Sequence, residues 1–326
     1  MAPISYRKIF VFFIFFLSVI FFAGKSVFAF DRQTSTALSR YIMASIYEKQ
    51  GDIDLAVQEY KKALKADDKN ALIHLSLGAA YIKKKQISLA IEEINRSIAL
   101  EPELVEPHAI LALLYFSQDK LSEAGKEYER ALQTAAKLEP KNISIFKSLG
   151  ILYLQQKDFK SAENTFLSII NMSPSDFEAH FYLANILDEQ KKRDFAIIEL
   201  KKVLELKPDY HQALNYLGYL YVEENRNLGE AEKLIKKAVE VEPENGAYID
   251  SLGWLYFKQG KIKEAVKELE KASILIDDPV IFDHLGDAYF KIQDLAAARG
   301  SWEKSLKLDP DQDKVKKKIE NSKNKK

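Results

Sequence analysis

The chain has 326 residues, no cysteine, and 48 basic residues against 48 acidic ones. This balance argues against a polyanion-binding role, because nucleic-acid-binding domains concentrate Lys and Arg. A hydrophobic fraction of 47% excludes an intrinsically disordered chain. The lack of cysteine excludes disulfide bonds and a lipid anchor on cysteine, and it is compatible with either redox compartment.

The first 29 residues have the three-part layout of a secretory signal. Arg7 and Lys8 precede an apolar run from Ile9 to Ala23 that only Ser18 interrupts. Small or modest side chains, Val27 and Ala29, stand three residues and one residue before a cut after Ala29. We therefore expect residues 1–29 to be an export signal.

A membrane anchor is the alternative interpretation of this segment. The apolar run of 15 residues is shorter than the roughly 20 helical residues that a bilayer core requires. Lys25 could lengthen it by placing its charge at the membrane surface. We expect an exported, periplasmic or extracytoplasmic protein, or one anchored in the inner membrane, with membrane contact only through residues 9–23 if the signal stays uncleaved.

A repeat with a period of 34 residues fills most of the remaining chain. The expected units are 37–70, 71–104, 105–142, 143–176, 177–210, 211–245, 246–278 and 279–312. They leave residues 30–36 as a linker and residues 313–326 as a lysine-rich capping helix and tail. Four extra residues around 134–138 lengthen either the second helix or the loop of the third unit, and one among 225–228 enlarges the turn of the sixth.

Two positions of the repeat hold a small residue in every unit. Because antiparallel helices about 8 to 10 Å apart need small side chains where they touch, we predict that each unit is a helical hairpin with this small pair at its contact point. The eighth position carries Ala44, Gly78, Ala112, Gly150, Ala184, Gly218, Gly253 and Gly286. The twentieth, allowing for the insertion in the sixth unit, carries Ala56, Ala90, Ala124, Ala162, Ala196, Ala231, Ala265 and Ala298.

Other features keep the same phase. Tyrosine stands three residues after the first small position in all units but the fifth, which has Leu187, and a large apolar residue stands four after the alanine. Proline is expected to close most second helices, because it cannot continue a helix; these prolines are Pro102, Pro140, Pro174, Pro208, Pro243, Pro279 and Pro310. Val315 and Ile319, at i, i+4, are expected to seal the last exposed face as a short helix.

This pattern resembles the tetratricopeptide repeat over residues 37–312. The clearest copy is Ser-Leu-Gly-Trp-Leu-Tyr at 251–256, followed by Ala265, Leu269 and Ala272. The resemblance implies an all-α fold, a right-handed α-solenoid superhelix of eight helix-turn-helix repeats. It also implies a scaffold that binds a peptide or helix segment of partner proteins, here of an exported bacterial type that acts in envelope assembly or secretion.

No constellation for catalysis, a cofactor or a metal is found in the sequence. His74, His108 and His180 all occupy the fourth position of their units, so they belong to separate hairpins and cannot share one metal site. We interpret them as structural rings. The chain is expected not to be an enzyme and to need no cofactor.

The resemblance also places a partner-binding groove on the first helices, where aromatic rings mix with amides and carboxylates in the second half of the chain. The predicted groove residues are Phe181, Tyr182, Asn185, Asp188, Asn215, Tyr216, Tyr219, Asp250, Trp254, Phe257, Asp287 and Phe290. Rings supply contact area at low entropy cost, and amides can hydrogen-bond a peptide backbone. Alternatively, the rings pack between neighbouring first helices.

The expected partners are proteins and not nucleic acid. Acidic groove residues, Asp188, Glu189, Asp250, Asp283 and Asp287, would favour a basic or neutral segment. Two rival functions remain open: a structural spacer that self-associates, and an accessory subunit of a cell-wall or polysaccharide enzyme complex.

Overall fold

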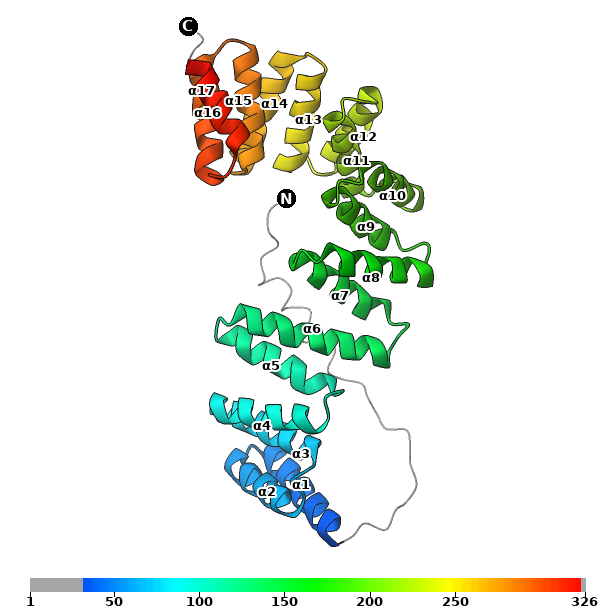
Figure 1. Cartoon of the computed structure of the whole chain (residues 1–326), viewed down its shortest axis with the longest axis vertical. Coiled ribbons are helices and arrows are strands. Elements are labelled where there is room, and N and C mark those ends of the chain that lie inside the picture. Colours follow the sequence, from blue (N-terminus) through cyan, green and yellow to red (C-terminus); the bar gives the residue numbers. More distant parts are fainter. Residues whose placement is uncertain (1–31, 324–326) are drawn as a thin grey trace. The chain divides into compact units, whose positions relative to one another are not determined.

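The computed structural model describes residues 32–323, and this part of the chain consists of 17 α-helices without a strand (Figure 1). It divides into two compact units, an N-terminal unit that ends at Ser168 and a C-terminal unit that begins at Ile169. The expected signal or anchor, residues 1–29, lies outside the described residues. No helix among the described ones is long and apolar enough to cross a membrane.

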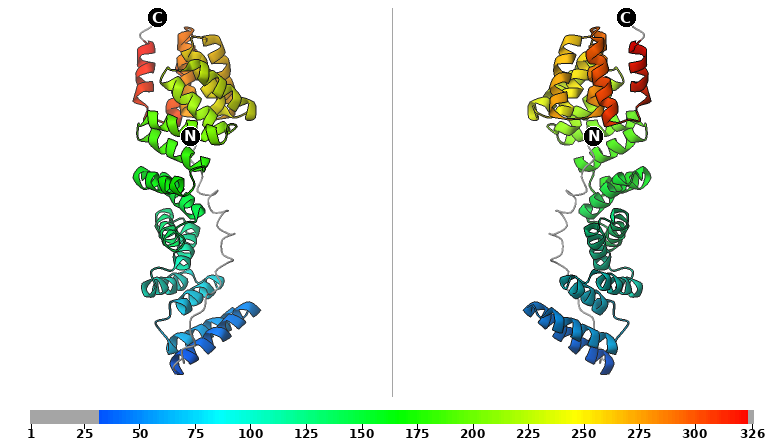
Figure 2. Two further views of the ribbon diagram at one scale, coloured as in Figure 1. Left: turned by 90° about the vertical axis from the view of Figure 1, so that its right-hand side faces the viewer. Right: turned by 90° about the vertical axis from the view of Figure 1, so that its left-hand side faces the viewer.

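The N-terminal unit is a run of antiparallel hairpins, each made of an odd-numbered first helix and an even-numbered second helix (Figure 2). Its helices are α1 (Arg32–Gln50), α2 (Ile53–Ala66), α3 (Ala71–Lys83), α4 (Ile87–Leu100), α5 (Val105–Ser117), α6 (Leu121–Leu138), α7 (Ile143–Gln155) and α8 (Phe159–Met172), within which the unit ends. Consecutive hairpins contact each other through a second helix and the next first helix.

The C-terminal unit repeats this arrangement and ends on a single short helix. Its helices are α9 (Phe177–Glu189), α10 (Arg193–Leu206), α11 (His211–Glu223), α12 (Leu228–Val241), α13 (Gly246–Lys258), α14 (Ile262–Leu275), α15 (Pro279–Lys291), α16 (Leu295–Leu308) and α17 (Asp313–Lys323). In addition, the first helix α13 contacts its neighbours α11 and α15, so these three first helices lie side by side.

The small residues are buried inside the hairpins, as their spacing predicts, but the contact differs in detail. All eight alanines of the twentieth position are buried. The glycines of the eighth position face the large residue four places after that alanine: a Cβ on Gly150 would lie 2.8 Å from the Phe166 ring, and one on Gly286 only 2.4 Å from the Trp302 ring. The glycine therefore makes room for a large side chain, and it is not simply the partner of the alanine.

Three boundaries differ from the sequence expectation or decide between its alternatives. The α1 helix begins at Arg32, so most of the expected linker is helical; no Gly or Pro interrupts it, and the Thr36 hydroxyl donates to the carbonyl of Arg32 at 2.7 Å. Pro279 opens α15 at its first turn, where its missing N–H costs nothing, and does not close α14. The four extra residues of the third unit extend α6 to 18 residues.

Candidate protein-binding surface

The twelve predicted groove residues lie on the first helices α9, α11, α13 and α15 of the C-terminal unit. Ten of them are half-buried, and none of the twelve is exposed. Asp250 and Trp254 are buried, with only 6% and 7% of their surface accessible. The prediction that all twelve face an open groove is therefore wrong for these two residues, which pack between neighbouring first helices.

An aromatic cluster covers the adjoining parts of α9 and α11. The Phe181 ring lies edge-on to Tyr210 at 5.2 Å and to Tyr216 at 6.3 Å between centroids. Tyr182 stands 6.2 Å from the same ring. Tyr210, which the sequence analysis did not single out, also contacts Phe177 at 5.0 Å. These edge-to-face contacts fix the orientation of the rings while leaving most of them partly accessible.

Asp188 is the polar centre beside this cluster. The Tyr216 hydroxyl donates to one of its oxygens at 3.0 Å, and Nε of Arg193 donates to the other at 3.0 Å. Burial and the nearby Asp188 charge raise the pKa of Tyr216, so its hydroxyl remains a donor. Asp188 is thus already neutralised by groups of its own chain.

The two asparagines of the predicted groove, Asn185 and Asn215, have different environments. The Asn185 side chain donates to the Phe181 carbonyl of its own helix at 2.8 Å. Asn215 is half-buried on α11, and its amide oxygen is buried without a hydrogen-bond partner among the described residues. A buried unpaired acceptor costs about 1 to 3 kcal/mol, so a side-chain movement that brings this oxygen to a hydrogen-bond donor would be favourable.

Trp254 is held between α11, α13 and α15. Its indole Nε1 donates to Glu223 at 2.8 Å, and its ring stacks on His284 with centroids 4.0 Å apart and planes 9° apart. Nδ1 of His284 lies 2.9 Å from a carboxylate oxygen of Asp250. Burial opposes the charged imidazolium, but the Asp250 charge and hydrogen bond outweigh it and raise the pKa of His284.

The acidic end of this surface is closed by the last helix. Nζ of Lys318, on α17, lies 2.6 Å from Asp283 and 2.8 Å from Asp287, both on α15. Burial raises the pKa of Asp287, although the Lys318 ammonium acts in the opposite direction. The acidic residues that suggested a preference for basic partners are therefore largely paired within the chain; Glu189, by contrast, is exposed.

The three repeat-phased histidines are buried structural groups. Nδ1 of each lies 2.6 Å from a glutamate 19 residues later, on the second helix of the same hairpin: Glu93 for His74, Glu127 for His108 and Glu199 for His180. Arg40 and Glu59 make the corresponding pair in the first hairpin at 2.9 Å. The recurring +19 spacing of base and acid was the sequence signal for these pairs, and the sequence analysis missed it. No group of three metal-binding side chains occurs in residues 32–323.

With the hairpins and their contacts established, comparison with known proteins gives the family of the repeat. Residues 44–85 match a family model described as TPR repeat, and residues 148–211 and 248–273 match two described as Tetratricopeptide repeat. The chain contains tetratricopeptide repeats. A similar fold occurs in a solved structure, a chain of the APC/C hetero-tetramer Cut9-Hcn1. The TM-score is 0.54 at 15% identity, over 88% of this chain and 69% of that one.

The chain spans a tenth or less of the length of the curated relatives that it matches. Protein O-mannosyl-transferase Tmtc3 of Drosophila melanogaster is 28% identical over 95 residues, which are 29% of this chain and 10% of that protein. Superkiller complex protein 3 of Mus musculus is 29% identical over 87 residues, which are 27% of this chain and 6% of that protein. The similarity thus covers a tenth or less of each relative.

Proposed function

We propose that the C-terminal unit binds a segment of a partner protein on the surface formed by its first helices. Tetratricopeptide repeat proteins generally mediate protein–protein interactions, which supports the class of function. The observation that carries the proposal is the unpaired amide oxygen of Asn215, which lies on α11 with the half-buried rings of Tyr216 and Tyr219. If the half-buried Asn215 side chain turns outward, this oxygen can accept an N–H of a bound peptide, and the rings would cover the neighbouring side chains.

The charge pairing on this surface favours a neutral, partly apolar segment. Asp188, Asp250 and Asp287 already interact with Arg193, His284 and Lys318 respectively. A basic partner would have to displace one of these cations, whereas an apolar segment would leave the pairs intact. Aromatic contacts, and not salt bridges, are therefore the proposed source of affinity.

We further propose that the protein is exported across a bacterial inner membrane and serves envelope assembly or secretion. Arg7 and Lys8, the apolar run Ile9–Ala23 and the small residues before a cut after Ala29 support export. Edman sequencing of the protein from its native cells would test this step. A chain that begins at Phe30 supports export with cleavage, a membrane-bound chain that keeps Met1 supports the anchor, and a cytosolic chain that keeps Met1 contradicts both.

The binding surface can be tested with a photo-crosslinking phenylalanine analogue at single positions of the full-length protein. Tyr219 and Phe257 are half-buried aromatic residues of the proposed surface, so the analogue roughly preserves their size. Phe195, on α10, is a matched control because it is an aromatic residue that is 61% exposed but lies on a second helix. We expect one shared partner segment to crosslink at Tyr219 and Phe257 and not at Phe195.

A second variant makes this test independent of ring chemistry. Asn215→Leu roughly keeps the size of the side chain but removes its acceptor oxygen, and it should weaken capture of the same segment at least tenfold, about 1.4 kcal/mol. Adducts that form equally at Phe195, or none at either surface position, would contradict the proposed binding surface.

A structural spacer is the second candidate function, and the burial of Asp250 and Trp254 favours it. These two residues fill space between first helices that a bound segment could otherwise use. In that case the crosslinks from Tyr219 and Phe257 would return only intramolecular adducts, and Asn215→Leu would change no interaction with another protein.

A further inference from the structure

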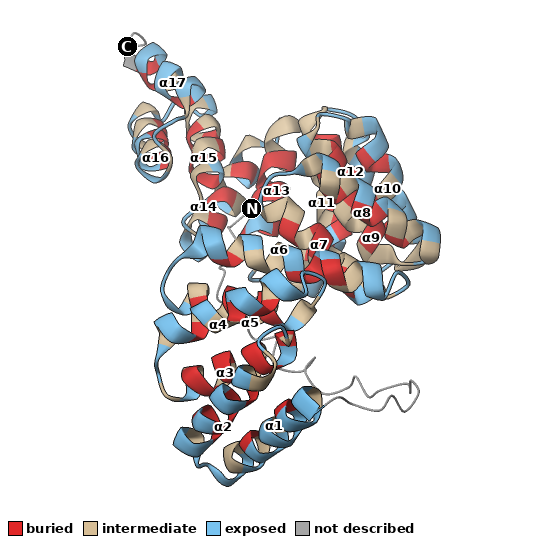
Figure 3. Ribbon diagram, turned by 60° about the horizontal axis from the view of Figure 1, so that its bottom comes forward, coloured by how far each residue is buried: buried red, intermediate tan, exposed pale blue. Residues whose placement is uncertain are grey.

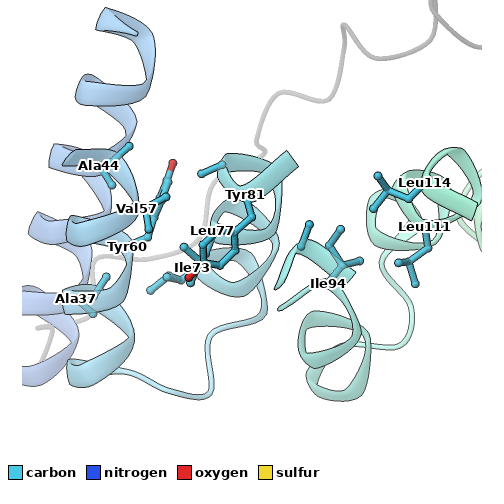
Figure 4. Packing of buried hydrophobic residues seen from close by; sticks show 14 residues of the cluster. Ala37, Ala44, Val57, Tyr60, Ile73, Leu77, Tyr81, Ile94, Leu111 and Leu114 are labelled. Atoms are coloured by element: carbon cyan, nitrogen blue, oxygen red, sulfur yellow. The ribbon is translucent and has the colours of Figure 1, made fainter. Parts of the chain in front are cut away.

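Apolar side chains join neighbouring hairpins at the start of the array. In Figure 4, Leu77 of α3 lies next to Tyr60 of the preceding α2, and both belong to one buried cluster. An aliphatic side chain carries no titratable group, so packing of this kind does not respond to pH. The C-terminal unit adds a contact of a different kind between the first helices α13 and α15.

His284 of α15 is buried against two residues of α13. Its Nδ1 lies 2.9 and 3.2 Å from the two carboxylate oxygens of Asp250. Its ring stacks on Trp254 at 4.0 Å, and the Trp254 indole donates to Glu223 of α11 at 2.8 Å. Nine of the 13 residues of α13 are buried, and these are red in Figure 3. Four side chains with little access to water therefore connect three first helices in series.

The Asp250 carboxylate depends on His284 alone. It is 6% exposed, and His284 is its only hydrogen-bond or ion-pair partner within residues 32–323. By contrast, Glu127, the partner of His108, also pairs with Arg130 at 2.9 Å. A neutral His284 would leave a buried carboxylate without a compensating charge, which is strongly unfavourable. A neutral His108 would not have this effect.

The other charged groups around the stack do not replace this pairing. Those that face it from neighbouring elements are Asp283 and Asp287 of α15, Glu223 of α11, Lys258 of α13 and Lys318 of α17. Lys258 lies 4.8 Å from the centre of the Trp254 ring, and Lys318 binds the two aspartates of α15. In the described part of the chain, His284 makes no hydrogen bond or ion pair with α14 or α16.

This environment favours the charged imidazolium. Burial opposes a charge on His284. The charge and hydrogen bond of Asp250 outweigh it, with support from the acidic residues nearby, and raise the pKa of His284.

The stack continues to the proposed binding surface. The Phe257 ring is stacked on Trp254 with centroids 4.7 Å apart and planes 8° apart. Phe257 is half-buried and is one of the rings that we propose to contact a partner. A movement of α15 away from α13 would take His284 off the Trp254 ring and leave Trp254 and Phe257 less ordered.

We infer that the charge on His284 is a pH switch that holds or releases the first-helix surface of the C-terminal unit. The protonated ring holds α15 against α13 and keeps the aromatic rings ordered. Loss of the proton leaves Asp250 as a buried anion, which turns toward water and separates the two helices. The consequence for binding rests on the proposed function: a partner segment binds more tightly at low pH, because ordered rings lose less freedom.

Tryptophan fluorescence can follow the stack without any partner. The chain has two tryptophans, so Trp302→Phe leaves Trp254 as the single reporter. Phe166 faces Gly150 in the fourth hairpin as Trp302 faces Gly286, so a phenylalanine suits this position. A stacked imidazolium quenches indole fluorescence more than neutral imidazole does. We expect the Trp254 emission to rise and to shift to longer wavelength between pH 6 and pH 9, and we expect His284→Asn to abolish this change.

The effect on binding can be measured with the photo-crosslinking analogue at Tyr219 of the full-length protein. In an extract of the native cells, the yield of the adduct with the segment identified in cells should fall about fivefold or more from pH 6 to pH 9. His284→Asn keeps an N–H donor but does not titrate, so its yield should be equal at both pH values. His211→Asn is the matched control, because His211 lies in the same unit and its Nδ1 contacts the Tyr248 hydroxyl at 2.8 Å. It should keep the pH dependence of the wild type.

Circular dichroism shows whether the variants are folded, and Asp250→Asn provides a second test. It removes the buried anion instead of the cation, so it should also abolish the fluorescence change and the pH dependence of the adduct yield. This variant decides the matter if His284→Asn fails to fold.

The outcomes separate the switch from the proposed function. A Trp254 emission that is constant between pH 6 and pH 9, or that changes equally in His284→Asn, would overturn the switch. An adduct yield that is constant, rises with pH or falls equally in His284→Asn would overturn its control of binding and leave the binding surface intact. A Trp254 emission that titrates through His284, with no adduct at either pH, would support the switch and contradict the proposed function.

Discussion

The two units place most of their side-chain polar pairs differently. In the N-terminal unit most such pairs join the two helices of one hairpin, as in Arg40–Glu59, His74–Glu93 and His108–Glu127, and Lys83–Glu48 is one pair that links successive first helices. The C-terminal unit keeps one such pair, His180–Glu199, and then links successive first helices through Tyr216–Asp188, Trp254–Glu223 and His284–Asp250. The same hairpin can thus direct its polar bonds inward or toward its neighbour.

This difference explains why a binding surface is proposed for only one unit. Bonds within a hairpin secure that hairpin and leave the first-helix surface to small and aliphatic side chains. Bonds between first helices fix the spacing of α11, α13 and α15 and orient the aromatic rings between them. Preorganised rings lose little freedom when a partner binds. This difference between the units predicts how changes in core packing, in polar pairing and in pH affect the stability of each unit.

The largest effect is expected for Trp302→Ala at the end of the C-terminal unit. Trp302 is 2% exposed and packs with Val315 and Ile319, so its removal should lower the free energy of unfolding by about 3 to 5 kcal/mol. Hydrogen exchange should show loss of protection in α15, α16 and α17. The hairpins of the N-terminal unit should keep their protection, since each repeat packs only on its neighbours. Uniform loss along the chain would contradict this local effect.

A medium effect is expected when one of the N-terminal pairs is broken. Glu127→Ala leaves the buried His108 without its partner. It should lower the free energy of unfolding by about 1 to 3 kcal/mol. The double variant His108→Phe with Glu127→Thr copies Phe146 and Thr165, which hold the same two positions in the next hairpin. Its free energy of unfolding should lie within about 1 kcal/mol of that of the wild type, because well-packed apolar residues can replace a buried pair.

Urea unfolding of both variants separates a pairing effect from a packing effect. If the double variant is as unstable as Glu127→Ala, the pair is not interchangeable with the apolar alternative, and the two kinds of hairpin are less alike than proposed.

The smallest effect is a pH dependence confined to the C-terminal unit. The pKa of His284 is raised above its ordinary value near 6.5 by Asp250, so protonation favours the folded state. The resulting stability is fully present below pH 6.5 and is lost as the pH rises through the raised pKa. Asp250→Asn removes the charge, so the stability advantage of the wild type over this variant should shrink as the pH rises from 6 to 9. A constant advantage would show that His284 does not titrate in this range.

The sequence predicted the hairpins well because their determinants are local and repeated. The buried alanines follow directly from their position in the repeat, and Val315 and Ile319 seal the last hairpin as expected. The site was predicted less well. Trp254 was assigned to an open surface because its helix position suggested it, yet burial depends on the facing residue of the next repeat, His284.

The pattern of a single repeat does not predict polar pairs between residues of neighbouring repeats. Asp250 and His284 are 34 residues apart, and Asp283 and Lys318 are 35 apart. Each pair depends on how neighbouring hairpins pack, which residue types alone do not fix. The pairs within a hairpin were recognisable from the constant spacing of 19 residues between histidine and glutamate.

The length of α6 shows which insertions such an array tolerates. Its 18 residues exceed the 14 of α4 by four. Four helical residues advance the chain by about 6 Å and rotate it by about 400°, only 40° more than one full turn. The chain therefore leaves α6 on almost the same side as it would have left a shorter helix, and α7 can start in the usual direction. An insertion of two residues would rotate the exit by about 200° and send the chain away from the array. Natural length variation within these helices should therefore come in steps of three, four or seven residues.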